Sequence, residues 1–134
     1  MTTVTLTAPN EPLNTRSKIK EVLLVFFTLV LIAVAQYCEE RNRYYEERDA
    51  AVNYLTLEVA LVLKLDQVQI SKIKDVNYEY YDRISSVHTG IDADQKTREK
   101  ETEQLYNTRN IKMASFLNQE QKSLWVTLCS KSSR

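Results

Sequence analysis

Few of the residue types that carry out catalysis or bind metals occur in this chain of 134 residues, which holds one histidine and two cysteines. His88 stands where a helix is predicted to end, and a histidine there normally interacts with the helix dipole or with water. Glu99 and Glu103 lie four residues apart and would share one helix face, where a solvated charged surface is the expected outcome. We therefore expect no metal site.

Patterns typical of enzymes or of nucleic-acid-binding proteins are equally scarce. No Ser-His-Asp, Cys-His or glycine-rich phosphate-loop arrangement is visible, and a single histidine restricts general-base chemistry. The 18 basic and 18 acidic side chains give a formal net charge of zero, so electrostatics provides no reason to bind nucleic acid. We expect no enzyme activity, no cofactor and no nucleic-acid partner.

The pattern that does recur is an apolar residue, then Asp or Asn, then Gln three positions later. It occurs three times, roughly 26 residues apart, as Leu65-Asp66-Gln67-Val68-Gln69, Ile91-Asp92-Ala93-Asp94-Gln95 and Leu117-Asn118-Gln119-Glu120-Gln121. An Asx side chain at a helix N-cap accepts from the first unpaired backbone N–H groups, and the Gln reaches back to the N–H of the cap. We therefore predict three capping boxes, opening helices after Asp66, Asp92 and Asn118.

Composition and periodicity predict an all-α fold of about four helices. The chain has one glycine, so the turn residues that a β-sandwich or barrel requires are missing. The first helix is predicted from near Cys38 to near Val62. Apolar residues alternate between Leu55 and Leu65 as in a strand, but no partner strand is visible, so we assign helix up to an extended lead over Leu63–Leu65.

The second helix is predicted over Gln67–Val87, with Gly90 in the left-handed conformation after its end. Its apolar stripe consists of Gln69, Ile73, Val76, Tyr80, Ile84 and Val87. The turns between helices are short, so neighbouring helices should pair antiparallel as long hairpins. Thin helices bury little core alone, so a homodimer is expected.

The N-terminal part contains an uncharged apolar run from Val22 to Ala35, about 14 residues long, which is shorter than an ordinary membrane span. Cations precede the run, and Ala33-Val34-Ala35 fits a signal-peptidase site. The run is either a cleaved export signal or an uncleaved anchor, so the membrane is a partner only through 22–35. Both alternatives place a domain of residues 36–134 outside the cytoplasm, after a leader of residues 1–35.

The two cysteines, Cys38 and Cys129, lie at opposite ends of the mature chain. In an oxidising compartment they could pair with each other or across a dimer. Nothing in the sequence brings their Cα atoms within disulfide distance, so the thiol forms remain an alternative.

The first and third boxes resemble the paired Leu-Thr-x-x-Gln boxes of the LTxxQ family of bacterial periplasmic proteins. This family includes the spheroplast protein Y chaperone, the envelope-stress inhibitor CpxP and related periplasmic metal sensors. Here Asp66 and Asn118 replace the family's Thr, and both are competent caps. The resemblance implies a curved helical homodimer in the periplasm that binds unfolded proteins without ATP. Alternatively, it implies a signalling module that docks the outer domain of a membrane sensor, or a stress or metal sensor.

Binding of unfolded clients requires adaptable apolar or aromatic surface flanked by charge, and the chain has eight tyrosines. Tyr78 and Tyr81 lie off the predicted stripe of the second helix, one turn apart, and are expected on another face. Tyr44, Tyr45 and Tyr106 are further candidates for client binding. The alternative is that these rings pack the dimer or lie singly on the surface.

Overall fold

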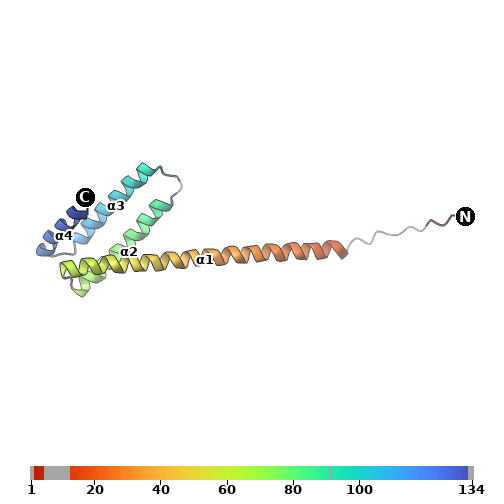
Figure 1. Cartoon of the computed structure of the whole chain (residues 1–134), viewed down its shortest axis with the longest axis horizontal. Coiled ribbons are helices and arrows are strands. Elements are labelled where there is room, and N and C mark those ends of the chain that lie inside the picture. The colour runs from red at the N-terminus through yellow and green to blue at the C-terminus, as the bar shows by residue number, and fades with distance from the viewer. Residues whose placement is uncertain (1, 5–12, 91, 133–134) are drawn as a thin grey trace. The chain divides into compact units, whose positions relative to one another are not determined.

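The computed structural model describes residues 2–4, 13–90 and 92–132. Four α-helices follow one another: α1 (Leu13–Leu63), α2 (Gln67–Thr89), α3 (Gln95–Ala114) and α4 (Gln119–Ser132) (Figure 1). The described residues contain no strand, so the predicted all-α class is confirmed. The chain divides into two compact units, Met1–Arg43 and Tyr44–Arg134, and α1 contributes to both.

The first helix starts much earlier than its predicted beginning near Cys38. The helix α1 begins at Leu13 and runs without a break through the apolar run Val22–Ala35. A helix is favoured there because an apolar segment satisfies its own backbone hydrogen bonds only in helical form when water is absent. The sequence analysis began the helix after a separate leader of residues 1–35, whereas in the structure one helix runs from Leu13 to Leu63.

The alternation of apolar residues near the end of α1 is helical, as predicted. One face buries Val52, Thr56, Val59 and Leu63, which follow each other at three- or four-residue spacing. The predicted extended lead over Leu63–Leu65 is wrong, because Leu63 is helical and Lys64 adopts φ 50°. The Leu65 N–H then donates to the Ala60 carbonyl at 3.1 Å, which is the long bond of a Schellman ending.

The single glycine does not have the left-handed role predicted for it. Gly90 follows α2 with φ −62° and ψ 127°, an extended conformation open to most residues. Its N–H donates to the Ser86 carbonyl at 3.1 Å, which ends the helix without a left-handed residue. The left-handed ending occurs at Lys64 instead, where a lysine tolerates it at a cost of about 1–2 kcal/mol.

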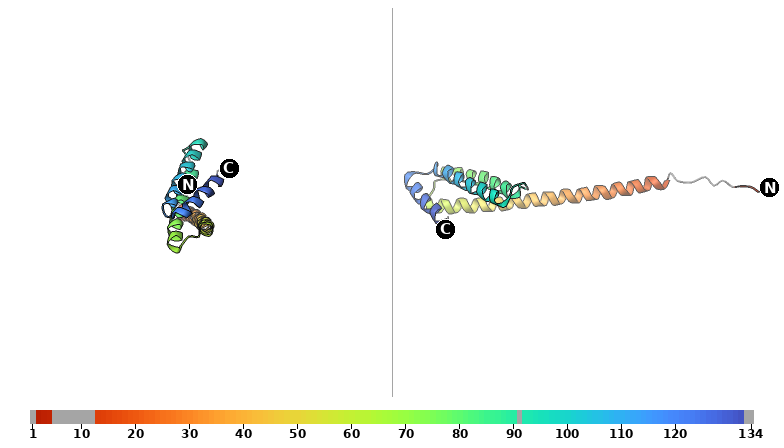
Figure 2. Two further views of the ribbon diagram at one scale, coloured as in Figure 1. Left: turned by 90° about the vertical axis from the view of Figure 1, so that its left-hand side faces the viewer. Right: turned by 90° about the horizontal axis from the view of Figure 1, so that it is seen from above.

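The core of the second unit draws on all four helices. Figures 1 and 2 show α2 and α3 side by side, and the contacts between helices include α3 against α4. The buried cluster consists of Val59, Leu63, Ile73, Val76, Tyr80, Met113, Leu117 and Trp125. Three of these, Ile73, Val76 and Tyr80, belong to the predicted α2 stripe. The Trp125 indole N–H also donates to the Asn110 carbonyl at 3.2 Å.

Two of the three predicted capping boxes are present. At the start of α2 the Gln69 N–H donates to Asp66 Oδ1 at 2.8 Å, and the Asp66 N–H donates to Gln69 Oε1 at 3.1 Å. At the start of α4 the Gln121 N–H donates to Asn118 Oδ1 and the Asn118 N–H to Gln121 Oε1, both at 2.9 Å. Leu65 is partly buried and Leu117 buried, and both pack with the core.

The box predicted at Asp92 and Gln95 is wrong by two residues. The helix α3 is capped by Asp94, whose Oδ1 accepts from the Thr97 N–H at 2.7 Å. That hydrogen bond is the main reason why the pKa of Asp94 lies below its ordinary value. Gln95 is therefore the first helical residue, and its side chain donates to Glu99 Oε1 at 2.9 Å. The motif contains two Asp residues, and the second of them is the cap.

The two correct boxes are also bonded to each other. Gln69 Nε2 donates to Gln121 Oε1 at 2.8 Å, and Gln121 Nε2 donates to Gln69 Oε1 at 3.2 Å. The second proton of each amide goes to a helix end, from Gln69 to the Phe116 carbonyl at 2.9 Å and from Gln121 to the Leu63 carbonyl at 3.2 Å. This amide pair therefore joins the ends of α1 and α3 to the starts of α2 and α4.

Removing the cap side chains should separate the true caps from the false one. We expect Asp66→Ala and Asn118→Ala each to lower the free energy of unfolding by about 0.5–2 kcal/mol, because the N3 backbone N–H loses its acceptor. Asp94→Ala should also destabilise the protein, whereas Asp92→Ala should leave its stability unchanged. Urea unfolding followed by circular dichroism provides the measurement. A larger loss for Asp92→Ala than for Asp94→Ala would contradict the assignment.

Candidate functional site: a tyrosine cluster and a cavity beside Arg109

Four of the five tyrosines predicted to bind clients gather around one arginine. The rings of Tyr44 and Tyr45 meet edge to face with centroids 5.6 Å apart, and Tyr44 lies 6.1 Å from Tyr81. The guanidinium carbon of Arg48 lies 4.8 Å from the Tyr45 ring centroid and 4.9 Å from that of Tyr78. These cation–π contacts connect the start of the unit's α1 segment with α2. We call these four tyrosines with Arg48 the tyrosine cluster.

Carboxylates complete the polar side of the tyrosine cluster. The Tyr44 hydroxyl donates to Asp82 Oδ1 at 2.8 Å, and Arg48 Nη1 lies 3.2 Å from Asp82 Oδ2. Arg48 also contacts Asp49 at 3.4 Å. Burial, followed by the bond to Asp82, raises the pKa of Tyr44. Burial, followed by the charge of Asp49, raises the pKa of Tyr78.

These contacts hold the four tyrosine rings in place within the domain. Tyr44, Tyr78 and Tyr81 are half-buried, and Tyr45 is 37 % exposed. Side chains in this arrangement fix α1 against α2 within one chain, which differs from both alternatives considered for them, packing of the dimer and single rings on the surface. A role of the tyrosine cluster in client binding stays a prediction. The fifth candidate, Tyr106, lies on α3 apart from these contacts and is 48 % exposed.

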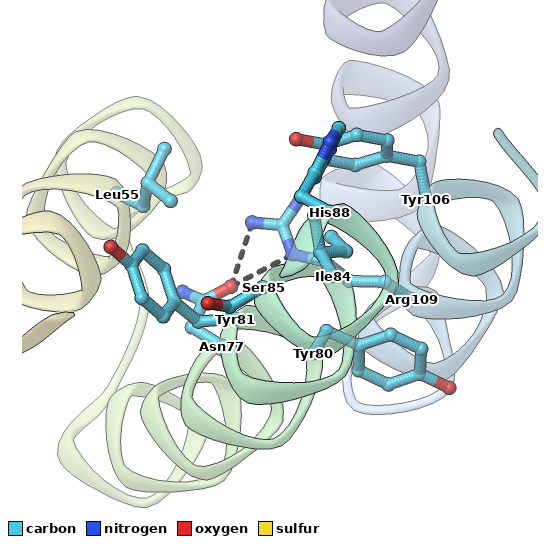
Figure 3. Close-up of a pocket in the computed structure, with 9 residues that line it drawn as sticks. All are labelled: Leu55, Asn77, Tyr80, Tyr81, Ile84, Ser85, His88, Tyr106 and Arg109. Carbon is cyan, nitrogen blue, oxygen red and sulfur yellow. Dashed lines mark hydrogen bonds between the residues drawn. The ribbon is translucent and has the colours of Figure 1, made fainter. Parts of the chain in front are cut away.

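A cavity of about 290 Å³ lies between α1, α2 and α3 (Figure 3). Its lining residues are Leu55, Asn77, Tyr80, Tyr81, Ile84, Ser85, His88, Tyr106 and Arg109. Two of the predicted tyrosines, Tyr81 and Tyr106, therefore contribute to one site from different helices. His88 also lines this cavity, a location that the sequence analysis did not anticipate for it.

A buried polar network of three helices forms one wall of this cavity. Asn77 is 2 % exposed. Its Nδ2 donates to Thr56 Oγ1 at 3.0 Å, and its Oδ1 accepts from Arg109 Nε at 2.9 Å and from Nη2 at 2.7 Å. Figure 3 shows the two bonds from the guanidinium to the amide. Sequence reasoning missed these residues, although Asn77 directly follows the stripe residue Val76, and a polar side chain beside a buried stripe normally has a hydrogen-bond partner.

The charge of Arg109 is only partly compensated. Burial lowers the pKa of this guanidinium. No carboxylate of the described residues lies within salt-bridge distance of it. Its hydrogen-bond partner in the network is the neutral amide of Asn77, which accepts two hydrogen bonds but carries no negative charge. A positive charge in such surroundings is costly unless an anion approaches it.

The remaining residues singled out for chemistry stay apart from one another. Among the described residues, no three His, Cys, Asp or Glu side chains are grouped to hold a metal ion. Glu99 accepts from Gln95, and the structure holds Cys38 and Cys129 as thiols and not as a disulfide. Burial raises the pKa of the Cys129 thiol, and the charge of Arg109 opposes this shift.

The chain matches no protein family, curated protein or solved structure with which it was compared. Its function is therefore argued from its own residues.

The Tyr44 hydroxyl should give the domain a specific alkaline response. Folding raises the pKa of the Tyr44 hydroxyl, first through burial and then through the bond to Asp82. The neutral hydroxyl therefore contributes its full stabilisation below the pKa of the unfolded chain, near 10, and this stabilisation is lost as pH rises through the folded pKa. We expect Tyr44→Phe to cost about 1 kcal/mol at pH 7 and to flatten the fall in stability above pH ~10. Urea unfolding at pH 8 and pH 11 measures both. Tyr54→Phe, at an exposed ring, is the control; an unchanged slope in Tyr44→Phe would contradict the account.

Proposed function

We propose that the protein is a membrane-anchored, ATP-independent, chaperone-like module that holds apolar segments of partly unfolded proteins outside the cytoplasm. The observation that carries this proposal is an exposed apolar stripe on α1, made by Tyr54, Leu57 and Leu61. These side chains are 68 %, 59 % and 70 % exposed and lie at the spacing of one helix face. They lie on the side of α1 opposite to the buried face that packs into the core.

This α1 stripe suits loose binding of extended or amphipathic segments. Large apolar side chains at helical spacing, with an aromatic ring at one end, offer contact area without a fixed shape. The tyrosine cluster supports the stripe by holding α1 against α2, so that α1 keeps its outer face open. In this proposal the tyrosines position the binding surface, and the client contacts Leu57 and Leu61 directly.

The continuity of α1 supports an uncleaved anchor over a removed signal. Among the residues that the structure describes, one helix is long and apolar enough, by length and composition, to cross a membrane. Large apolar side chains from Ile19 to Tyr37 are exposed, and no charge interrupts the helix from Val22 to Cys38. These 17 or so residues span about 25 Å, close to the lower limit for a bilayer core. The helix does not end at Ala35.

The charges beside the span support placement of the domain outside the cytoplasm. The segment before the span carries Arg16, Lys18 and Lys20. After the span, Glu39 and Glu40 come first and basic residues follow, and Arg43 lies 3.7 Å from Glu39. Positive residues favour the cytoplasmic side, so the N-terminal segment is assigned to that side. A bacterial protein of this orientation would present residues 44–134 to the periplasm.

The proposal includes the antiparallel pairing of α2 with α3 and the homodimer expected from the sequence. Only nine apolar residues of the described chain are buried, which is a small core for a domain. A second copy that covered part of the exposed apolar surface would add burial. An anchor also concentrates copies in the plane of the membrane, which favours association.

Client binding is tested by the suppression of aggregation of a chemically denatured protein, using the full chain in lipid nanodiscs. We expect suppression at stoichiometric ratio, and Leu57→Asp should weaken client affinity roughly tenfold because a charge replaces an exposed leucine that the client would cover. Asn107→Asp places the same charge at an exposed residue of a different helix, α3, and serves as the matched control. Absence of suppression by a folded wild-type sample would rule out the chaperone-like function.

The second candidate function is a signalling module that docks the outer domain of a membrane sensor. The anchor favours it, because a tethered domain meets a membrane partner at high effective concentration. Crosslinking in native membranes distinguishes the two. One stoichiometric membrane partner would support the signalling module, and a mixture of unfolded proteins would support the chaperone-like one.

A further inference from the structure

The cavity beside Arg109 has the charge of an anion site. None of its nine lining residues is an aspartate or glutamate, while Arg109 supplies a permanent positive charge. His88 adds an imidazole, and Ser85 adds a hydroxyl. The acidic residues of the neighbouring tyrosine cluster, Asp49 and Asp82, are already engaged by Arg48 and do not line this cavity.

The guanidinium retains donors for a ligand. Its Nε and Nη2 donate to the same oxygen of Asn77, which fixes the plane of the group. Nη1 makes no hydrogen bond with the described residues. It is also not one of the side-chain atoms that are fully buried without a partner. An Arg side chain has five N–H donors, so the end formed by Nη1 and the second proton of Nη2 is left for bidentate bonding.

The walls of the cavity determine what the anion must be attached to. Leu55 from α1 and Ile84 from α2 supply aliphatic surface, and the rings of Tyr80, Tyr81 and Tyr106 supply aromatic surface. Figure 3 shows Leu55 and Tyr81 on one side of the guanidinium and Tyr106 on another. A volume of about 290 Å³ equals that of roughly ten water molecules, so a ligand of about that number of heavy atoms fits.

We propose that this cavity binds a small organic carboxylate with an apolar body, the carboxylate on the outer N–H pair of Arg109 and the body between Leu55, Ile84 and the tyrosine rings. The carboxylate is favoured over a phosphate because its two oxygens match the available N–H pair. It also carries only a single charge, so its transfer from water to a site with apolar walls costs less free energy. The site is independent of the proposed client binding by the α1 stripe.

Two sources supply this chemistry, a free aryl- or alkyl-carboxylic acid and the C-terminal residue of a polypeptide. The full chain in zwitterionic nanodiscs is titrated with 3-phenylpropanoate and, separately, with N-acetyl-phenylalanine, and binding is followed by calorimetry. The neutral amides of both compounds are the matched ligands. We expect each bound acid to exceed its amide by roughly 10- to 100-fold in affinity, the effect of hydrogen bonds to a charged group.

The variants test the residue assignment. Arg109→Gln should reduce acid binding to the level of the amide, whereas Lys100→Gln, which removes an exposed charge from the same helix, should leave it unchanged. Leu55→Trp fills the cavity from α1 while it leaves the Asn77–Arg109 bonds in place, and it should also abolish binding. Circular dichroism melting confirms the fold of each variant, and Leu55→Trp decides the matter where Arg109→Gln does not fold.

Each outcome has a defined meaning. Binding of 3-phenylpropanoate alone supports a free acid as the ligand, and binding of N-acetyl-phenylalanine supports a chain end. Failure of both acids to bind, equal binding of acid and amide, or undiminished binding by a folded Arg109→Gln or Leu55→Trp protein would overturn the proposal. Suppression of client aggregation by the α1 stripe is tested separately, because Leu57 does not line the cavity.

Discussion

The reciprocal hydrogen bonds between the amides of Gln69 and Gln121 connect the ends of every helix in the domain. Each Oε1 accepts from its own cap N–H and from the opposite amide, and each Nε2 donates to the opposite amide and to a helix-ending carbonyl, at Phe116 or Leu63. All donors and acceptors of the pair are thus used. Because Gln121 is buried, loss of any one partner would leave a polar group without water or protein to satisfy it.

That constraint also explains which parts of the fold could be predicted from sequence. The caps at Asp66 and Asn118 depend on residues within one turn, so local spacing identified them. The same spacing misplaced the start of α3, because Asp94 also fits a cap and only the following turn selects between the two. The bonds between the boxes join residues 52 apart in sequence, and no local pattern reports such a pairing.

The candidate sites show the same division between local and long-range information. The tyrosines were found as a composition bias, but their engagement with Arg48 depends on how α1 packs against α2. The network of Asn77 and Arg109 joins residues 32 apart and was not anticipated. A polar side chain in an apolar stripe indicates that a partner exists, and only the packing of the third helix identifies that partner. The ending of α1 at Lys64 was likewise invisible, since glycine is the usual indicator of a left-handed residue.

These features form one account of how the domain works. The amide pair and the core fix the four helix ends, and the tyrosine cluster fixes α1 against α2. This leaves the stripe of Tyr54, Leu57 and Leu61 on α1 exposed, and it leaves the charge of Arg109 without a carboxylate partner among the described residues.

The most direct test of this account is a double-mutant cycle on Gln69→Ala and Gln121→Ala, with the free energy of unfolding measured by urea titration. Each single variant loses its own cap bond, and the cycle isolates the bonds between the two boxes. We expect a coupling energy of about 1–2 kcal/mol, within the range measured for contacting residues. Additivity of the two losses to within about 0.5 kcal/mol would show that the boxes act independently and would contradict the account.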